Sequence, residues 1–285
     1  MFRDRLITAA VLIPLVVAGI YWASTPVLGV VLAAVILIGA WEWTLLMGLN
    51  RDWQRLLYVV LVAVLLVLAA PLGERPRELM QLLTVVMLCW GAVFVWIIIL
   101  NSRGPISHRP VSALLSGLSG IWLLIPSWLA ILWLHGRPST GPTLVLLLML
   151  LVWGADGGAY LAGRKWGQRK LATQVSPNKT WEGVGGGALL ALAFVLPLSL
   201  WLLGGMTVGR SLFWPAYIAL CLVTITFSII GDLFESVAKR HAGVKDSGHI
   251  LPGHGGVLDR IDSLTAAAPC FSLGLLLLSS TGDGS

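Results

Sequence analysis

Long runs of apolar residues, separated by short polar segments, make up most of this chain. Several runs reach the ~20 residues that a helix needs to cross the ~30 Å hydrocarbon core of a bilayer. The runs are continuous and do not alternate with polar residues, which excludes a transmembrane β-barrel. The pattern therefore predicts an all-α polytopic integral membrane protein. We expect about nine transmembrane helices, at residues 6–22, 27–47, 56–71, 79–100, 111–134, 142–164, 184–204, 212–238 and 262–279.

The composition agrees with this pattern. Of the 285 residues 57% are hydrophobic and 11% are charged, and the mean hydropathy is +0.89. A water-soluble domain of this size is far more polar. The three cysteines (Cys89, Cys221 and Cys270) lie in apolar runs without paired spacing, so we expect packing residues and no disulfide or metal site.

The net charge of +6 raises the question of a nucleic-acid partner. We expect none, because no zinc finger, RNA-binding signature or long basic arm is present. Basic loops on the cytoplasmic side of a membrane explain the charge better. If the N-terminus is cytoplasmic, 15 of the 19 Lys and Arg residues lie on that side. The sequence thus predicts a cytoplasmic N-terminus and an external C-terminus.

Ionisable residues are distributed unevenly along the chain. The first half is almost free of charge inside its apolar runs, with the exception of Glu42 between Trp41 and Trp43. An ionisable group within a membrane span is a functional candidate. Because Arg51 and Asp52 follow soon after, we favour an interfacial residue near a helix end. We treat residues 1–285 as one membrane domain, with 1–140 mainly scaffold and 141–285 carrying the chemistry.

The densest charge lies between residues 232 and 262. This stretch contains five carboxylates (Asp232, Glu235, Asp246, Asp259, Asp262), four fixed cations (Lys239, Arg240, Lys245, Arg260) and three of the five histidines. In a helix Asp232, Glu235, Ser236 and Lys239 share one face, because they stand at positions i, i+3, i+4 and i+7. The glycine-rich turn at 252–256 allows backbone amides to approach a phosphate. His254 in that turn is a ligand, a base or a hydrogen-bonding scaffold.

A second polar cluster spans residues 153–183. Asp156 has small neighbours (Gly154, Gly157, Gly158 and Ala159), which let a helix or a ligand approach closely. A basic loop follows, and then Ser176, Lys179 and Thr180 precede the seventh apolar run, as in an anion site at a helix start. Alone, this segment is an ordinary helix N-terminus behind a positive-inside loop. Two such clusters on one side of the membrane instead favour a functional site.

Carboxylates beside cations suit the binding of metal ions and phosphates. Oxygen ligands of this kind favour Mg²⁺ over zinc. Phosphoryl and nucleotidyl transfer depend on positioning and on neutralising charge with metals and cations. A lipid-phosphate substrate explains why the charges gather beside membrane segments.

The C-terminal residues resemble the signature of a known family, the phosphatidate cytidylyltransferases (CDP-diacylglycerol synthases). The matching residues are Ser236-x-Ala238-Lys239-Arg240-x4-Lys245-Asp246-x-Gly248-x2-Leu251-Pro252-x-His254-Gly255-Gly256-Val257-x-Asp259-Arg260-Ile261-Asp262. The segments at 5–14, 41–43, 156–167 and 176–183 also resemble the family, so the resemblance covers nearly the whole chain. The chain departs at Ala238, where the family more often has a bulkier apolar residue.

This resemblance implies that CTP and phosphatidic acid react to give CDP-diacylglycerol and pyrophosphate, for phospholipid biosynthesis. It implies Mg²⁺ as cofactor, leaves a second cation open, and places a multi-pass enzyme in a bacterial-type inner membrane with its site facing the cytoplasm. A homodimer is an open alternative to a monomer. The nucleophile is already an anionic phosphate, so no strong general base is required.

The expected site residues fall into three groups. The expected metal ligands are Asp232, Asp246 and Asp259, with Asp262 and Asp156 as weaker candidates. The expected catalytic residues are Asp246, Lys239, Lys245 and Arg260. The expected substrate-binding residues are Ser176, Lys179, Thr180, Arg240, His254, Gly255, Gly256 and Arg164.

Three other functions are less well supported. A CDP-alcohol phosphatidyltransferase needs an Asp-Gly-x2-Ala-Arg pattern, but here Tyr160 follows Ala159 and the later aspartates are missing. A transporter needs intramembrane charges in matched halves, whereas these charges lie in loops and at one membrane edge. A purely structural membrane protein leaves the carboxylates unexplained.

Overall fold

The computed structural model describes residues 13–104, 111–203, 213–248, 250 and 255–280. Within these residues, eight helices are long and apolar enough to cross a membrane. They are α2 (Thr25–Leu46), α3 (Asp52–Ala69), α4 (Pro76–Ser102), α5 (Ala113–His135), α6 (Gly141–Trp166), α7 (Trp181–Leu203), α8 (Phe213–Ala242) and α9 (Leu258–Ser280). A short 3-10 helix, η1 (Ala70–Glu74), extends α3.

The prediction of an all-α polytopic membrane protein is confirmed. Each of the eight long helices begins and ends within a few residues of a predicted span. The predicted span at 6–22 corresponds to a shorter apolar helix at Ile13–Trp22, and residues 6–12 lie outside the described part. Prolines near the first turn of α2, α4 and α6 help to set these starts, because their fixed φ suits a position that needs no N–H donor.

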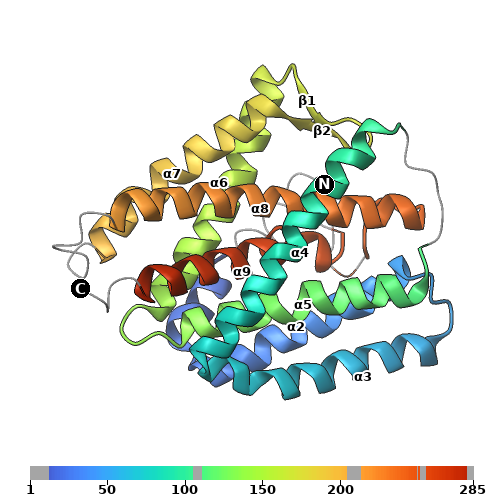
Figure 1. The fold of residues 1–285 in the computed structure, drawn as a ribbon, viewed down its shortest axis with the longest axis horizontal. Coiled ribbons are helices and arrows are strands. Elements are labelled where there is room, and N and C mark those ends of the chain that lie inside the picture. The colour runs from blue at the N-terminus through green and yellow to red at the C-terminus, as the bar shows by residue number, and fades with distance from the viewer. Residues whose placement is uncertain (1–12, 105–110, 204–212, 249, 251–254, 281–285) are drawn as a thin grey trace.

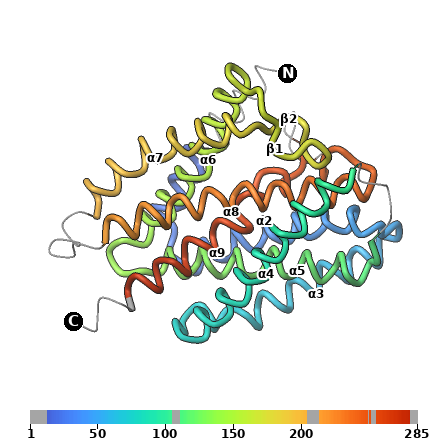
Figure 2. Tube along the Cα trace, turned by 45° about the horizontal axis from the view of Figure 1, so that its top comes forward, coloured from blue at the N-terminus to red at the C-terminus, as the bar shows by residue number. Residues whose placement is uncertain are grey.

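Helices α8 and α9 lie side by side through the middle of the molecule (Figures 1 and 2). Helices α6 and α7 lie on one side of them, and α2, α3 and α5 on the other, with α4 crossing the bundle. In α9 every residue from Ser263 to Ser272 is buried. Helix α3, in contrast, turns many large apolar side chains outward, as expected for a helix that faces lipid.

The close crossing of α6 and α7 confirms the prediction made from the small residues around Asp156. A Cβ atom added at Gly158 would stand 2.9 Å from the carbonyl oxygen of Gly186, closer than side chains pack. One at Gly154 would stand 3.0 Å from the Cα of Ala191. Small residues at four-residue spacing let the two backbones touch. This close packing fixes α6, and therefore Asp156, relative to α7.

A β-hairpin between α6 and α7 was not predicted. Strands β1 (Lys170–Ala172) and β2 (Ser176–Thr180) pair antiparallel, with Lys170 opposite Thr180. The expected helix start at 176–183 is therefore a strand followed by a helix. Thr180 caps α7, since its hydroxyl accepts the N–H of Gly183 at 3.1 Å. The hairpin brings Lys179 of β2 against Asp232 of α8.

Helix α8 ends with a left-handed glycine just after its charged residues. Gly243 has φ of 73°, a conformation that costs glycine little, and the N–H of Val244 donates to the carbonyl of Lys239 at 3.0 Å. The chain then turns back toward α9 through Lys245 and Asp246. The hairpin and the C-terminal ends of α2, α4 and α8 lie toward the same end of the molecule (Figure 1, right).

Candidate active site

A buried lysine joins α8 to α9. The Nζ atom of Lys239 lies 2.7 Å from Glu235 Oε2 and 2.6 Å from Asp259 Oδ1. The side chains of Lys239, Glu235 and Asp259 are 13%, 0% and 8% exposed. Glu235 and Lys239 are one helical turn apart, as the face predicted from their spacing requires. The pairing of two carboxylates with one cation makes this cluster a rigid link between the two helices.

The N-terminus of α9 is held by two carboxylates. Asp259 accepts the backbone N–H groups of Gly256 at 2.8 Å and Ser247 at 3.0 Å. Glu42, from α2, accepts the N–H groups of Val257 at 3.0 Å and Leu258 at 2.7 Å. The first N–H groups of a helix lack partners within it, and negative charge is favourable there. The segment that joins α8 to α9 is thus fastened at both ends.

Glu42 lies near the C-terminal end of α2, as expected, but it is not exposed there. Its side chain is 1% exposed, and it lies inside the bundle, where Ser247 Oγ also donates to it at 3.5 Å. One feature of the sequence indicated this role: a carboxylate flanked by two tryptophans inside an apolar run. The partners were hidden because they are more than 200 residues away.

The two polar clusters of the sequence meet on the same face of α8, about two helical turns before Lys239. Lys179 of β2 lies 2.6 Å from Asp232 Oδ2 of α8, and both side chains are about a quarter exposed. Ser236 donates to the second oxygen of Asp232 at 3.3 Å. Asp156 of α6 lies in the electrostatic field of Asp232, Lys179 and Arg260. Its side chain also hydrogen-bonds with that of Ser263. This open, mixed-charge group combines residues from α6, β2, α8 and α9.

Asp262 connects this open group to the buried one. Its charge environment includes Asp232 and Glu235, and its side chain contacts that of Glu235. The Oδ1 atom of Asp262 accepts the N–H of Ser263 at 2.7 Å. Four carboxylates therefore gather around α8 and α9, at Asp156, Asp232, Glu235 and Asp262. Sequence reasoning named all four but left Glu235 outside the site.

The remaining expected site residues surround this centre less tightly. Lys245 and Asp246 are exposed, and Asp246 lies beside Gly255, whose φ is 79°. Arg164 is exposed at the end of α6, where it donates to the Tyr160 hydroxyl at 3.4 Å. His254 lies outside the described residues.

Other expected contacts are already made within the protein. Ser176 is half-buried in β2 and pairs with Ala172, while Arg240 is half-buried on α8. The amide expected to face phosphate at Gly256 donates to Asp259 instead. Phosphate binding there would have to replace this bond.

The carboxylate oxygens of the site are the kind of ligand that Mg²⁺ prefers, but they do not form a closed metal site. In the part of the chain that the structure describes, no three His, Cys, Asp or Glu side chains are grouped to hold a metal ion. Mg²⁺ characteristically binds through one or two carboxylates together with substrate phosphates and water. Asp232, with Asp156 and Asp262 beside it, offers that partial set of oxygen ligands.

The fold and the site define a class: a multi-pass helical membrane protein with a cluster of carboxylates and cations between its helices. The model of the cytidylyltransferase family matches residues 3–278. A phosphatidate cytidylyltransferase of Pseudomonas aeruginosa is 38% identical over 272 residues, which cover 95% of this chain and 96% of that protein. One of Haemophilus influenzae is 35% identical over 283 residues, with 95% and 98% covered. The chain belongs to the cytidylyltransferase family.

Proposed function

We propose that this protein transfers CMP from CTP to phosphatidic acid, giving CDP-diacylglycerol and pyrophosphate for phospholipid biosynthesis. The observation that carries this proposal is the contact of Lys179 with Asp232, because it joins both charged clusters into one site. The near full-length similarity to proteins named phosphatidate cytidylyltransferase supports the choice of substrates.

The reaction forms one phosphorus–oxygen bond and breaks another. An oxygen of the phosphatidate phosphate attacks the α-phosphorus of CTP. The bond from that phosphorus to the oxygen bridging the α- and β-phosphates breaks, and pyrophosphate leaves with the electron pair. Since the attacking phosphate is already an anion, the protein has to bring two polyanions together and stabilise charge more than remove a proton.

The cations of the site suit this task. We assign Lys179, Lys245, Arg240 and Arg260 to the phosphates of the two substrates. Lys245 is exposed beside Asp246, and Lys179 is partly exposed, so both can reach a ligand from solvent. Lys239 is enclosed by Glu235 and Asp259, and we propose that it acts on phosphate mainly by holding α8 and α9 in position.

We propose that Asp232 is the main carboxylate for Mg²⁺, with Asp156 and Asp262 nearby. We propose Asp246 as a further ligand, while Asp259 is engaged in holding α9. A bound Mg²⁺ would neutralise phosphate charge. Bound metal would compete with Lys179 for Asp232, so this lysine is free to turn toward a phosphate when the metal is present. A second cation remains part of the proposal.

We further propose an orientation and a location. The site faces the cytoplasm of a bacterial-type inner membrane, because the Lys and Arg residues concentrate on the side of the predicted loops that carry it. Residues 1–140 serve mainly as scaffold and 141–285 carry the chemistry. We propose no nucleic-acid partner and leave a homodimer as a possible assembly.

The function is tested with purified protein in detergent, CTP and phosphatidic acid. Liponucleotide and pyrophosphate are expected in equal amounts. Lys245→Met is expected to lower kcat by ~10²–10³, as for removal of one preorganised donor to developing charge, without changing the thermal midpoint. A protein that binds CTP and phosphatidic acid but forms no CDP-diacylglycerol would refute the proposal, and release of CMP from CDP-diacylglycerol would favour a phosphatidyltransferase.

The metal is tested separately. EDTA is expected to abolish product formation, and added Mg²⁺ to restore it. Asp232→Asn is expected to raise the Mg²⁺ concentration needed for half-maximal rate by about 10-fold or more, because it removes a charged oxygen ligand. Asp52→Asn, at the exposed first turn of α3, is the matched control and should not change this concentration. Full activity in EDTA, or an unchanged Mg²⁺ requirement in Asp232→Asn, would contradict the assignment.

A further inference from the structure

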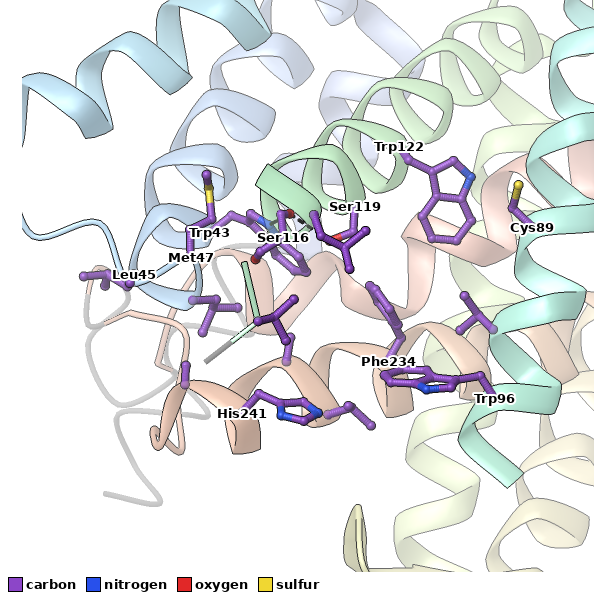
Figure 3. Close-up of a pocket in the computed structure, with 18 residues that line it drawn as sticks. Trp43, Leu45, Met47, Cys89, Trp96, Ser116, Ser119, Trp122, Phe234 and His241 are labelled. Carbon is purple, nitrogen blue, oxygen red and sulfur yellow. Dashed lines mark hydrogen bonds between the residues drawn. The ribbon is translucent and has the colours of Figure 1, made fainter. Parts of the chain in front are cut away.

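An apolar cavity lies between α2, α4, α5 and α8, with a volume of about 560 Å³. Its walls include Trp43, Trp96, Trp122 and Phe234, with His241 at one end (Figure 3). Ligand pockets in proteins have volumes of roughly 300–1,000 Å³ and are lined mainly by apolar and aromatic side chains. The cavity is therefore large enough for a ligand, and the function proposed above does not use it.

The cavity and the charged site lie on opposite faces of α8. Asp232, Ser236 and Lys239 form the charged face, whereas Phe234, Val237 and His241 line the cavity. At about 100° per residue, the charged set lies within roughly 40° of Asp232, whereas the cavity set lies about 140–200° around the helix from Asp232. The body of α8 thus separates the cavity from the phosphates of the proposed reaction.

Two of the residues that line this cavity each have a buried ring nitrogen without a partner. Among the described residues, neither Trp122 Nε1 nor His241 Nδ1 has a hydrogen-bond partner. The nearby Trp43 Nε1, in contrast, donates to the carbonyl of Ser116 at 2.7 Å. A buried donor left unpaired costs roughly 1–3 kcal/mol. Because both atoms are buried, a ligand in the cavity would pair with them only after the Trp122 or His241 ring turns toward it.

The cavity is bordered by the outer surface of the bundle. Leu45, Trp96 and Leu115 line it and are 44%, 41% and 60% exposed, while Trp43 on the inner wall is 1% exposed. In a multi-pass membrane protein, exposed apolar side chains such as these contact lipid. Tryptophan is typical of the depth at which lipid headgroups meet acyl chains. The cavity thus opens onto the apolar outer surface of the bundle.

We propose that this cavity binds one diacyl phospholipid of the bilayer, distinct from the phosphatidate that reacts. One acyl chain lies against the aromatic cluster around Phe234, and the Trp122 and His241 rings turn to donate hydrogen bonds to the ester carbonyl oxygens. Because Phe234, Val237 and His241 belong to α8, the bound lipid braces the helix that carries Asp232 and Lys239 on its other face.

The chain contains its own probe for this proposal. Cys89 lines the cavity and is exposed, while Cys221 and Cys270 are buried. Delipidated protein in detergent is treated with a maleimide, with and without phosphatidylcholine, which has no free phosphate to react with CTP. We expect phosphatidylcholine to slow the alkylation of Cys89 saturably. A cysteine at Leu68, on the exposed face of α3, in a Cys89→Ser background, is the matched control and should show only weak, unsaturable protection.

Native mass spectrometry gives an independent test. Unmodified protein incubated with phosphatidylcholine is expected to retain one lipid, and Ser119→Trp, which fills the cavity from α5, is expected to lose it. No saturable protection of Cys89 and no retained lipid would overturn the proposal. A disulfide between the Cys89 residues of two copies would also overturn it, in favour of a protein occupant. These measurements do not use CTP, so they remain valid if the proposed reaction is wrong.

Discussion

Replacing Lys239 with methionine is expected to destabilise the protein by about 3–5 kcal/mol, because it leaves a buried carboxylate without its cation. Glu235 is completely buried, and Lys239 is its cation in the structure. Asp259 would lose the same partner and, with it, the link from α8 to α9. We expect a lower thermal midpoint in detergent and a loss of CDP-diacylglycerol formation of at least ~100-fold.

A structural role for Lys239 is separated from a direct one by a second substitution. Adding Glu235→Gln to Lys239→Met removes the uncompensated charge and should recover part of the thermal midpoint. It should not restore activity, because α9 still lacks the bond from Lys239 to Asp259. Lys245→Met, on an exposed residue, should keep the wild-type midpoint while losing activity. A normal midpoint in Lys239→Met would contradict the structural role.

The fold was predictable from sequence because the bilayer imposes a simple rule on it. Every backbone polar group in hydrocarbon must be bonded within the segment, so long apolar runs become helices of known minimum length. The ends of α2, α4, α6 and α9 follow from this rule and from nearby prolines and charges. The β-hairpin was not predicted because its residues, Lys170 to Thr180, form a basic, mostly polar segment without the alternation of apolar residues that marks a strand.

Some of the residues of the site could also be predicted from the sequence, because regular helical geometry brings them together. Asp232, Glu235 and Lys239 share a face because helical geometry requires it, and the structure keeps this relation. The contact between Lys179 and Asp232 was foreseen only as two clusters on one side of the membrane. Its pairing depends on how β2 packs against α8, which no local pattern contains.

The spacing of the carboxylates did not predict which of them hold the backbone and which face a ligand. Asp232 and Asp259 have similar neighbours in the sequence, since each lies within a few residues of a basic residue and another acid. In the structure Asp259 accepts bonds from Lys239 and two backbone amides, whereas Asp232 is partly exposed beside Lys179. Which acid holds the backbone and which faces a ligand is decided by burial and by long-range contacts.

Glu42 gives the second large expected effect. Glu42→Ala would leave the amides of Val257 and Leu258 without an acceptor, at roughly 1–3 kcal/mol for each buried group. The segment from Asp246 to Gly256 would lose its attachment to α2. The positions of Lys245 and Asp246 would then be less well defined. We expect faster hydrogen exchange at residues 246–260, measured by mass spectrometry, a lower thermal midpoint and a strong loss of product formation.

Conservative changes at Glu42 test whether its charge or only its shape matters. Glu42→Gln keeps one acceptor oxygen but turns an NH₂ group toward a backbone N–H, so its exchange rate and activity should fall between those of wild type and Glu42→Ala. Glu78→Ala, which breaks an exposed pair with Arg75, is the matched control and should change stability by less than about 1 kcal/mol. If exchange at 246–260 stays at the wild-type rate in Glu42→Ala, the carboxylate does not hold α9, and the activity loss would need another cause.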